Sequence, residues 1–235
     1  MVLLWTAAAC LLDFGLTRLR LRRDLHPHDR ALWLHKWCII GLHRLNVAHC
    51  AEGTAPSRGL LVANHLSYLD IMVLSALQPC AFVSKKEVRD WPLFGRLATL
   101  SGTIYIDRER TVDVVRANHD LREALGEGVL CVLFPEGTSS DGSEVLPFRA
   151  PLLEAAVQTE EFVTAAHIRY EAKHADIAQD ICYWGDMNFF PHLLRMLAVR
   201  EIRAVVRFAP EGRRYADRKE AALSTRRTVI ALGSV

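Results

Sequence analysis

Short apolar runs alternate with helical patterns along most of this chain, and no other feature of the sequence constrains its fold as strongly. The β-type runs occupy residues 60–63, 81–84, 103–106, 129–134, 162–168 and 202–208. Between two of them, residues 111–125 repeat apolar side chains at helical spacing before Gly126, which indicates a helix that ends at a glycine. Strands that alternate with helices predict an α/β fold, here a single domain over residues 47–235 with a mostly parallel central sheet flanked by helices.

The composition excludes several classes of protein. Hydrophobic residues make up 51% of the 235 residues and charged residues 24%, a balance typical of a globular chain rather than a disordered one. The net charge is only +2, and no basic run interleaves with aromatic residues, so we expect no nucleic-acid partner. The six cysteines are scattered and form no C-x-x-C pair, which indicates buried free thiols and argues against a metal site.

Residues 1–46 form an N-terminal region of different character. Residues 2–16 are apolar apart from Thr6 and Asp13, and arginines follow at positions 18, 20, 22 and 23. A signal peptide carries its charge before the apolar stretch, and this stretch is short for a membrane span. We therefore expect a helix that lies at the membrane with its arginines at the head-group layer, the alternatives being a core helix or a truncated anchor. Residues 31–45 predict a second helix, with Trp33 and Trp37 on one face, that packs on the domain or lies at the membrane.

The segment NHLSYLD (64–70) is the first candidate for chemistry, because it follows the apolar run 60–63 and ligands bind at the carboxyl ends of strands in open α/β sheets. Ser67 and Asp70 have the spacing of a capping box, which predicts a helix that starts at Ser67. His65 then lies just before the helix and Asp70 in its first turn. A hydrogen bond between them fixes the tautomer of the imidazole and leaves its other nitrogen to accept a proton. Alone, Asp70 is also explained as a simple helix cap.

Two further polar clusters follow other predicted strands, in GTIYIDR (102–108) and FPEGTSS (134–140). The candidate residues are Gly102, Asp107 and Arg108 in the first cluster, and Glu136, Gly137 and Thr138 in the second. Singly, the first is explained by a surface ion pair and the second by an ordinary turn. Together with His65, the clusters predict polar groups that converge on one cleft.

These three segments resemble the sequence blocks of the glycerolipid acyltransferase family typified by 1-acyl-sn-glycerol-3-phosphate acyltransferase. NHLSYLD matches the N-H-x4-D block, GTIYIDR matches the second block and FPEGTSS the third, and their order and spacing agree. Residues 85–97 also resemble the stretch that precedes the second block in this family. The resemblance extends from about residue 32 to the C-terminus.

The resemblance implies a mechanism without an acyl-enzyme. His65 would take the proton from the hydroxyl of a lysolipid, which attacks the thioester of acyl-CoA or acyl-carrier protein, while Asp70 orients the histidine. Backbone N–H groups after His65 would stabilise the developing oxyanion. Residues implied to bind substrate, the phosphate or polar head group above all, are Arg108, Glu136, Gly137, Thr138, Gly102 and Asp107. No cofactor and no metal are implied, and the expected location is the cytoplasmic face of the inner membrane, peripheral or singly anchored.

The chain departs from the family pattern in ways that bear on the acceptor. Ser139 stands where the third block usually has an arginine, and residues 162–168 lack the proline of the fourth block. Residues 145–153 and 183–187 resemble a bacterial subgroup that includes members that acylate lyso-ornithine lipid. We expect acylation of 1-acyl-sn-glycerol-3-phosphate to phosphatidate, with lyso-ornithine lipid or another lysolipid as the alternative acceptor. A non-catalytic lipid-binding protein and a hydrolase are two further alternatives, and the His65–Asp70 pair counts against the first.

Overall fold

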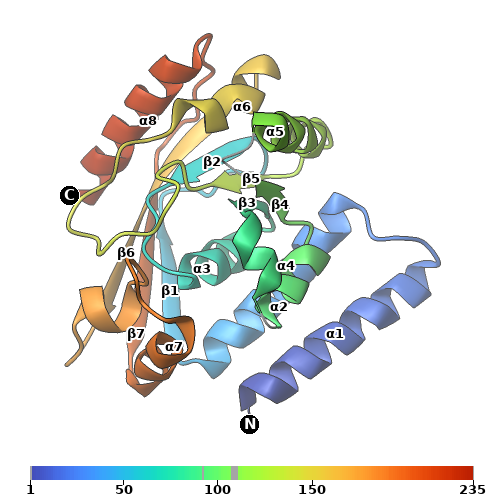
Figure 1. Ribbon diagram of the computed structural model, residues 1–235, viewed down its shortest axis with the longest axis vertical. Helices are drawn as coiled ribbons and strands as arrows, with labels where there is room; N and C mark the ends of the chain where they lie inside the picture. Colours follow the sequence, from blue (N-terminus) through green and yellow to red (C-terminus); the bar gives the residue numbers. More distant parts are fainter. Residues whose placement is uncertain (1, 92, 107–110, 235) are drawn as a thin grey trace.

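The computed structural model describes residues 2–91, 93–106 and 111–234, and a seven-stranded sheet forms the centre of this part of the chain (Figure 1). The strands are β1 (Val47–Glu52), β2 (Leu60–Ala63), β3 (Ala81–Lys85), β4 (Ile104–Ile106), β5 (Cys131–Leu133), β6 (Val163–Ala172) and β7 (Ile202–Phe208). Their order across the sheet is β1-β7-β6-β2-β5-β3-β4. All neighbours pair in parallel except β6 and β7, which are antiparallel. The predicted α/β domain with a mostly parallel sheet is confirmed.

Helices cover both faces of the sheet (Figure 1). They are α1 (Val2–Leu21), α2 (Pro27–Arg44), α3 (Leu69–Leu77), α4 (Phe94–Leu100), α5 (Thr111–Gly126), α6 (Glu154–Gln158), α7 (Phe189–Ala198) and α8 (Arg218–Gly233). The short helical turns are η1 (Lys86–Asp90), η2 (Ala150–Leu153) and η3 (Ile177–Ile181). Strand β2 shows how the core divides, because successive side chains of a strand point to opposite faces. Leu61 and Ala63 pack in the cluster with α2, α3 and α7, whereas Leu60 and Val62 pack in the cluster with α5 and α8.

All six predicted strands are present, but β1 is not among the predictions. Its sequence, Val-Ala-His-Cys-Ala-Glu, belongs to an edge strand of which only Val47 is buried, so no apolar run or clean alternation marks it. Asp217 caps α8, because its carboxylate accepts hydrogen bonds from the amides of Lys219 and Glu220 at 2.9 Å. All six cysteines are free, and all but Cys50 are buried.

Helix α1 packs along α2 through one face. The rings of Phe14 and Trp33 meet edge to face at 5.1 Å, and the Asp13 carboxylate accepts hydrogen bonds from Lys36 and from the Trp37 indole, both at 2.8 Å. The opposite face of α1 exposes four large apolar side chains, Trp5, Leu12, Leu16 and Leu19. Among the described residues, no helix combines the length and apolar character that a membrane crossing requires. The predicted membrane contact of residues 1–46 therefore stays a prediction.

Candidate active site

The turn that follows β2 is fixed to the neighbouring strand by Asn64. This side chain is buried and bonds the backbone of Ile168 on β6 twice. Its amide donates to the Ile168 carbonyl at 2.9 Å, and its carbonyl accepts from the Ile168 N–H at 2.7 Å. Because two buried backbone groups depend on one side chain, the position of the next residue, His65, is set by the sheet itself.

His65 is held by its backbone as well as by its ring. Its N–H donates to Glu136 Oε1 at 2.9 Å, and its carbonyl accepts from the Ser140 N–H at 2.9 Å. The imidazole stacks on the ring of Phe134, with centroids 4.1 Å apart and planes 12° apart. Both Phe134 and Glu136 follow β5, so the first and third sequence blocks meet at the carboxyl ends of adjacent strands.

Asp70, in the first turn of α3, is fully buried, and its carboxylate accepts four hydrogen bonds. Its Oδ2 accepts from His65 Nδ1 at 2.7 Å, from the Leu66 N–H at 2.7 Å and from the Ser67 N–H at 3.0 Å. Its Oδ1 accepts from the hydroxyl of Tyr170 at 2.6 Å. The predicted His65–Asp70 hydrogen bond is confirmed, and the Nδ1–H tautomer that it favours leaves Nε2 as the nitrogen able to accept a proton.

The capping box at this position is only half formed. Helix α3 begins at Leu69 rather than at Ser67, and the Ser67 hydroxyl is buried without a hydrogen-bond partner in the described part of the chain. The expectation that backbone N–H groups after His65 stabilise an oxyanion is wrong for Leu66 and Ser67, because both amides donate to Asp70. The carboxylate of Asp70 occupies these donors, so neither amide is available to a substrate oxygen.

Glu136 is buried below the site rather than exposed to it. Its two carboxylate oxygens accept from the backbone N–H groups of His65 at 2.9 Å and Leu146 at 3.0 Å. Burial raises the pKa of Glu136 to about 7, and the two amide donors and nearby Arg226 only partly oppose this shift. The side chain was predicted to contact the substrate head group. In the structure it instead ties the His65 turn to the loop at Leu146, so the geometry gives it a positioning role.

A cavity of about 220 Å³ lies beside the imidazole of His65, and we name it the His65 cavity. Of the predicted substrate-binding residues, Gly137 and Thr138 line it. Much of its wall is aromatic or apolar, and the polar lining includes Lys85. The complete lining is His65, Tyr68, Ile71, Phe82, Val83, Ser84, Lys85, Val88, Trp91, Phe134, Gly137, Thr138, Ser139, Tyr183, Trp184 and Gly185. An apolar wall with a few convergent polar groups is the usual form of a small-molecule site.

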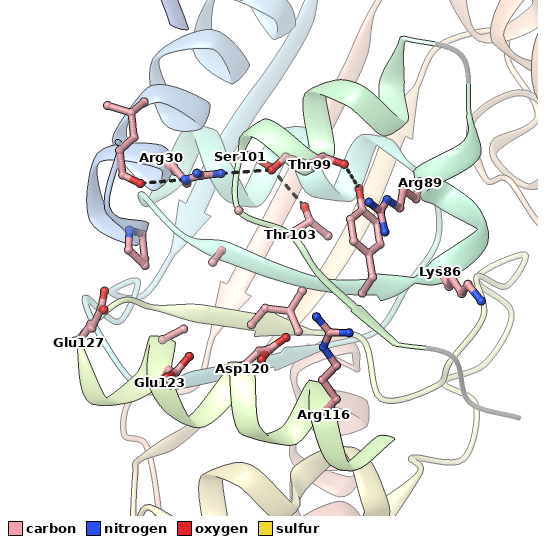
Figure 2. A pocket seen from close by; sticks show the side chains of 17 residues that line it. Arg30, Lys86, Arg89, Thr99, Ser101, Thr103, Arg116, Asp120, Glu123 and Glu127 are labelled. Atoms are coloured by element: carbon pink, nitrogen blue, oxygen red, sulfur yellow. Dashed lines mark hydrogen bonds between the residues drawn. The ribbon is translucent and has the colours of Figure 1, made fainter. Parts of the chain in front are cut away.

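A second and larger cavity, about 820 Å³, lies at the free edge of the sheet beside β4 (Figure 2), and we name it the edge cavity. Gly102, from the second sequence block, lines this cavity and not the His65 cavity. The predicted residues Asp107 and Arg108 lie outside the described residues. The predicted convergence on one cleft is therefore confirmed for the first and third blocks, because His65, Gly137 and Thr138 line the same cavity. It is not confirmed for Gly102, the described candidate of the second block.

Sequence reasoning misses two features, the contact of Tyr170 with Asp70 and the cluster of charged side chains on α5. Trp184, by contrast, lies in the segment 183–187 that resembles the bacterial subgroup. Tyr170 bonds Asp70 across 100 residues of sequence, and Trp184 lines the His65 cavity while its indole donates to the Ala178 carbonyl at 2.9 Å. His119, Asp120 and Glu123 bring possible metal ligands to within 4.8 Å of one another on α5. They are exposed or half-buried, and His119 lies within ion-pair distance of both carboxylates, so they form an ordinary charged helix surface.

Comparison with known proteins agrees with this geometry. Residues 46–169 match the Acyltransferase family, and the chain belongs to that family. The chain is 38% identical over 161 residues to a lyso-ornithine lipid O-acyltransferase of Brucella abortus, covering 63% of this chain and 60% of the relative. It is 33% identical over 138 residues to a 1-acyl-sn-glycerol-3-phosphate acyltransferase of Neisseria gonorrhoeae, covering 55% of this chain and 54% of the relative.

The fold has also been seen in a solved structure. The crystal structure of the 1-acyl-sn-glycerophosphate (LPA) acyltransferase PlsC from Thermotoga maritima superposes with a TM-score of 0.66 at 20% identity, covering 97% of this chain and 88% of that chain. At this identity the likeness shows the fold alone. The chain matches about 60% of the length of the lyso-ornithine lipid O-acyltransferases from Brucella abortus and Rhizobium meliloti.

Proposed function

We propose that this protein transfers a fatty acyl group from a thioester donor to the free hydroxyl of a lysolipid. The observation that carries the proposal is the 2.7 Å hydrogen bond between His65 Nδ1 and the buried carboxylate of Asp70, at the wall of a largely apolar cavity. A histidine oriented by a carboxylate is a general base, and an apolar cavity suits an acyl chain. Membership of the Acyltransferase family supports the same chemistry.

In the proposed reaction, His65 Nε2 accepts the proton of the acceptor hydroxyl as its oxygen attacks the thioester carbonyl carbon. The tetrahedral intermediate collapses with formation of the ester and cleavage of the carbon–sulfur bond, and the sulfur leaves as a thiol with the proton returned by His65. Asp70 orients His65 and stabilises the imidazolium between these two proton transfers. Acyl-CoA or acyl-carrier protein is the proposed donor, and no step requires a metal or a cofactor.

The proposed acceptor is 1-acyl-sn-glycerol-3-phosphate, with phosphatidate as the product, and lyso-ornithine lipid is the second candidate. One observation favours the second candidate. Ser139, at the position where the family usually has an arginine, lines the His65 cavity, and its hydroxyl donates to the Tyr183 carbonyl. This position therefore supplies no cation for a phosphate. Relatives with both substrate names match the chain, which supports each acceptor equally.

The acyltransferase region in this proposal is residues 47–235, and residues 1–46 form the membrane-associated helices at the cytoplasmic face of the inner membrane. The apolar outer face of α1, with Trp5, Leu12, Leu16 and Leu19 exposed, supports this assignment. Attachment would be peripheral or through a single anchor. Access to a lysolipid requires such contact, because the substrate is held in the lipid layer.

A panel of acceptors tests the proposal. Purified full-length protein is supplied with labelled acyl-CoA or acyl-carrier protein and either 1-acyl-sn-glycerol-3-phosphate or lyso-ornithine lipid, and the lipid products are separated. We expect label in the diacylated product of at least one acceptor. Release of free labelled fatty acid without any acylated lipid would identify a hydrolase. Binding of lysolipid without turnover of any donor would identify a lipid-binding protein, and either result would refute the proposed transfer.

A further inference from the structure

Helix α7 exposes an apolar face that the proposed reaction does not use. Phe190, Leu194 and Leu197 are 60%, 70% and 39% exposed, and their spacing of four and three residues places them on one side of the helix. We call these three residues the α7 face. The opposite side anchors the helix, because His192 and Met196 are buried in the protein. These buried residues fix the orientation of α7, so that the α7 face points toward solvent.

A continuous path of aromatic rings joins the α7 face to the His65 cavity. Phe190 lies edge to face with Phe189 at 5.4 Å. Phe189 in turn contacts Tyr68 at 5.2 Å and Trp91 at 4.9 Å, and both of these residues line the His65 cavity. Phe94 of α4, which is also exposed, contacts Phe189 at 5.1 Å. The apolar surface thus continues inward to the site where a lipid would react.

The charges around the α7 face match a lipid surface. Arg195 lies within α7 and Arg200 shortly beyond its end, and both are exposed. Together with Lys173 they outnumber the acidic side chains Asp180 and Glu201, which line the same hollow. An apolar helix face beside arginines is the pattern of a helix that lies in the interfacial layer, with large side chains below the head groups and cations among the phosphates. A protein partner would not need the continuity between this surface and the cavity, whereas a lipid that passes from a membrane to His65 does.

From these observations we infer that the α7 face docks on an anionic lipid bilayer and delivers lipid to the His65 cavity. The delivery of lipid to His65 rests on the proposed function, whereas the docking itself does not depend on turnover. It adds a second membrane contact, formed by the acyltransferase region, to the contact proposed for residues 1–46.

The test compares two double variants of the full chain on vesicles. Phe190→Ser with Leu194→Ser removes the two most exposed side chains of the α7 face, and Leu223→Ser with Ile230→Ser removes two exposed apolar side chains, 61% and 39% exposed, from α8. Helix α8 packs on the other face of the sheet, so it serves as the matched control (Figure 1). Binding is measured by co-sedimentation with vesicles of phosphatidylethanolamine and phosphatidylglycerol, without donor or acceptor. Thermal unfolding of both variants establishes that the fold is intact.

We expect the α7 double variant to bind these vesicles roughly tenfold or more weakly than the wild type, since removing one large apolar side chain from water is worth about an order of magnitude in an equilibrium constant. The α8 double variant should bind like the wild type. Equal binding by the two double variants overturns the inference. So does unchanged vesicle binding together with loss of a dimer in sedimentation velocity, because the α7 face would then join two copies of the chain.

A second measurement reports insertion directly and does not require loss of binding. A cysteine introduced by Leu194→Cys is labelled with an environment-sensitive fluorophore, with Leu223→Cys as the control and the wild type as the blank for its native thiols. We expect a blue shift on vesicles for the label at position 194 only. The fluorescence measurement contains no substrate, so it reports docking independently of turnover. A blue shift here, together with no acyl transfer in the acceptor panel described above, would refute the proposed function and leave the docking intact. Acyl transfer without a blue shift would do the reverse.

Discussion

Of the His65 cavity and the edge cavity, the smaller one carries the candidate catalytic groups. The His65 cavity measures about 220 Å³ and the edge cavity about 820 Å³. The smaller cavity is bounded by the ends of parallel strands, and its key residue, His65, is fixed by three hydrogen bonds, to Asp70, Glu136 and Ser140. At the larger cavity, Arg30 donates to the carbonyls of Leu25, Thr99 and Leu100 and so joins α2 to the end of α4 (Figure 2).

The contrast shows that preorganisation, and not volume, marks the candidate site. At the His65 cavity, a buried carboxylate with four donors holds a histidine whose remaining nitrogen is available. At the edge cavity, basic and acidic side chains share the lining, among them Arg89, Arg116, Asp120 and Glu123. The hydroxyls of Thr99, Ser101 and Thr103 bond one another, backbone carbonyls or the phenolic hydroxyl of Tyr105. These hydroxyls are thus partnered, and in the described part of the chain no histidine lines the edge cavity, so it shows no counterpart of the His65–Asp70 pair.

The strongest test of this contrast is His65→Ala. We expect kcat/KM for acyl transfer to fall at least roughly a hundredfold, which is the usual lower limit for loss of a general base, while the fold is retained. Asp120→Asn in the edge cavity should leave kcat/KM within about twofold of the wild type. Both variants are assayed with labelled acyl-CoA under identical conditions. An active and folded His65→Ala enzyme, or an inactive Asp120→Asn enzyme, would break the comparison.

A smaller effect is expected for Tyr170→Phe. This change removes the hydroxyl that donates to Asp70 Oδ1 at 2.6 Å and leaves a buried carboxylate oxygen without its partner, at a cost of about 1–3 kcal/mol in the free energy of unfolding. Because Asp70 is then held less firmly against His65, kcat should fall roughly tenfold with little change in KM. Tyr215→Phe is the control, since its hydroxyl bonds Ser224 and lines neither cavity. If both substitutions lowered kcat alike, the positioning role of Tyr170 would be lost.

The last test concerns stability rather than turnover, and measures a pH dependence that Glu136→Gln should remove. The pKa of Glu136 is raised from 4.5 to about 7 by burial, so between these values the folded protein binds more protons than the unfolded chain. The stability of the wild type should therefore decline as pH rises from about 4.5 toward 7. Glutamine does not titrate, although its amide satisfies only one of the two N–H groups. Urea unfolding from pH 5 to pH 8 measures both proteins, and parallel curves would contradict the assignment.

The parts of the fold that follow from local pattern were predictable from the sequence. The apolar run 60–63 is buried on both faces as β2, and Gly126 ends α5 as its position indicates. Strand β1 was not predictable, because an edge strand is stabilised by its pairing with β7, which lies more than a hundred residues away in sequence. The antiparallel pairing of β6 with β7 has the same origin in long-range contacts.

The candidate site divides in the same way. The His65–Asp70 bond joins residues five positions apart, so the spacing of the motif was sufficient to predict it. Tyr170 reaches Asp70 only because β6 lies beside β2, and no local pattern encodes that neighbourhood. The inward orientation of Glu136 depends on the path of the loop that brings the Leu146 N–H to its carboxylate. The sequence therefore predicted the reacting pair but not the groups that hold it.

The stacking of His65 on Phe134, with centroids 4.1 Å apart, has a consequence for the course of the proposed reaction. When His65 accepts the proton, the stacked ring becomes a cation above the negative face of the phenyl ring, and the contact becomes a cation–π interaction. Phe134 then stabilises the charged intermediate more than the resting enzyme. A residue that in the unreacted protein only packs would thereby lower the barrier selectively, because its contribution grows as the charge develops.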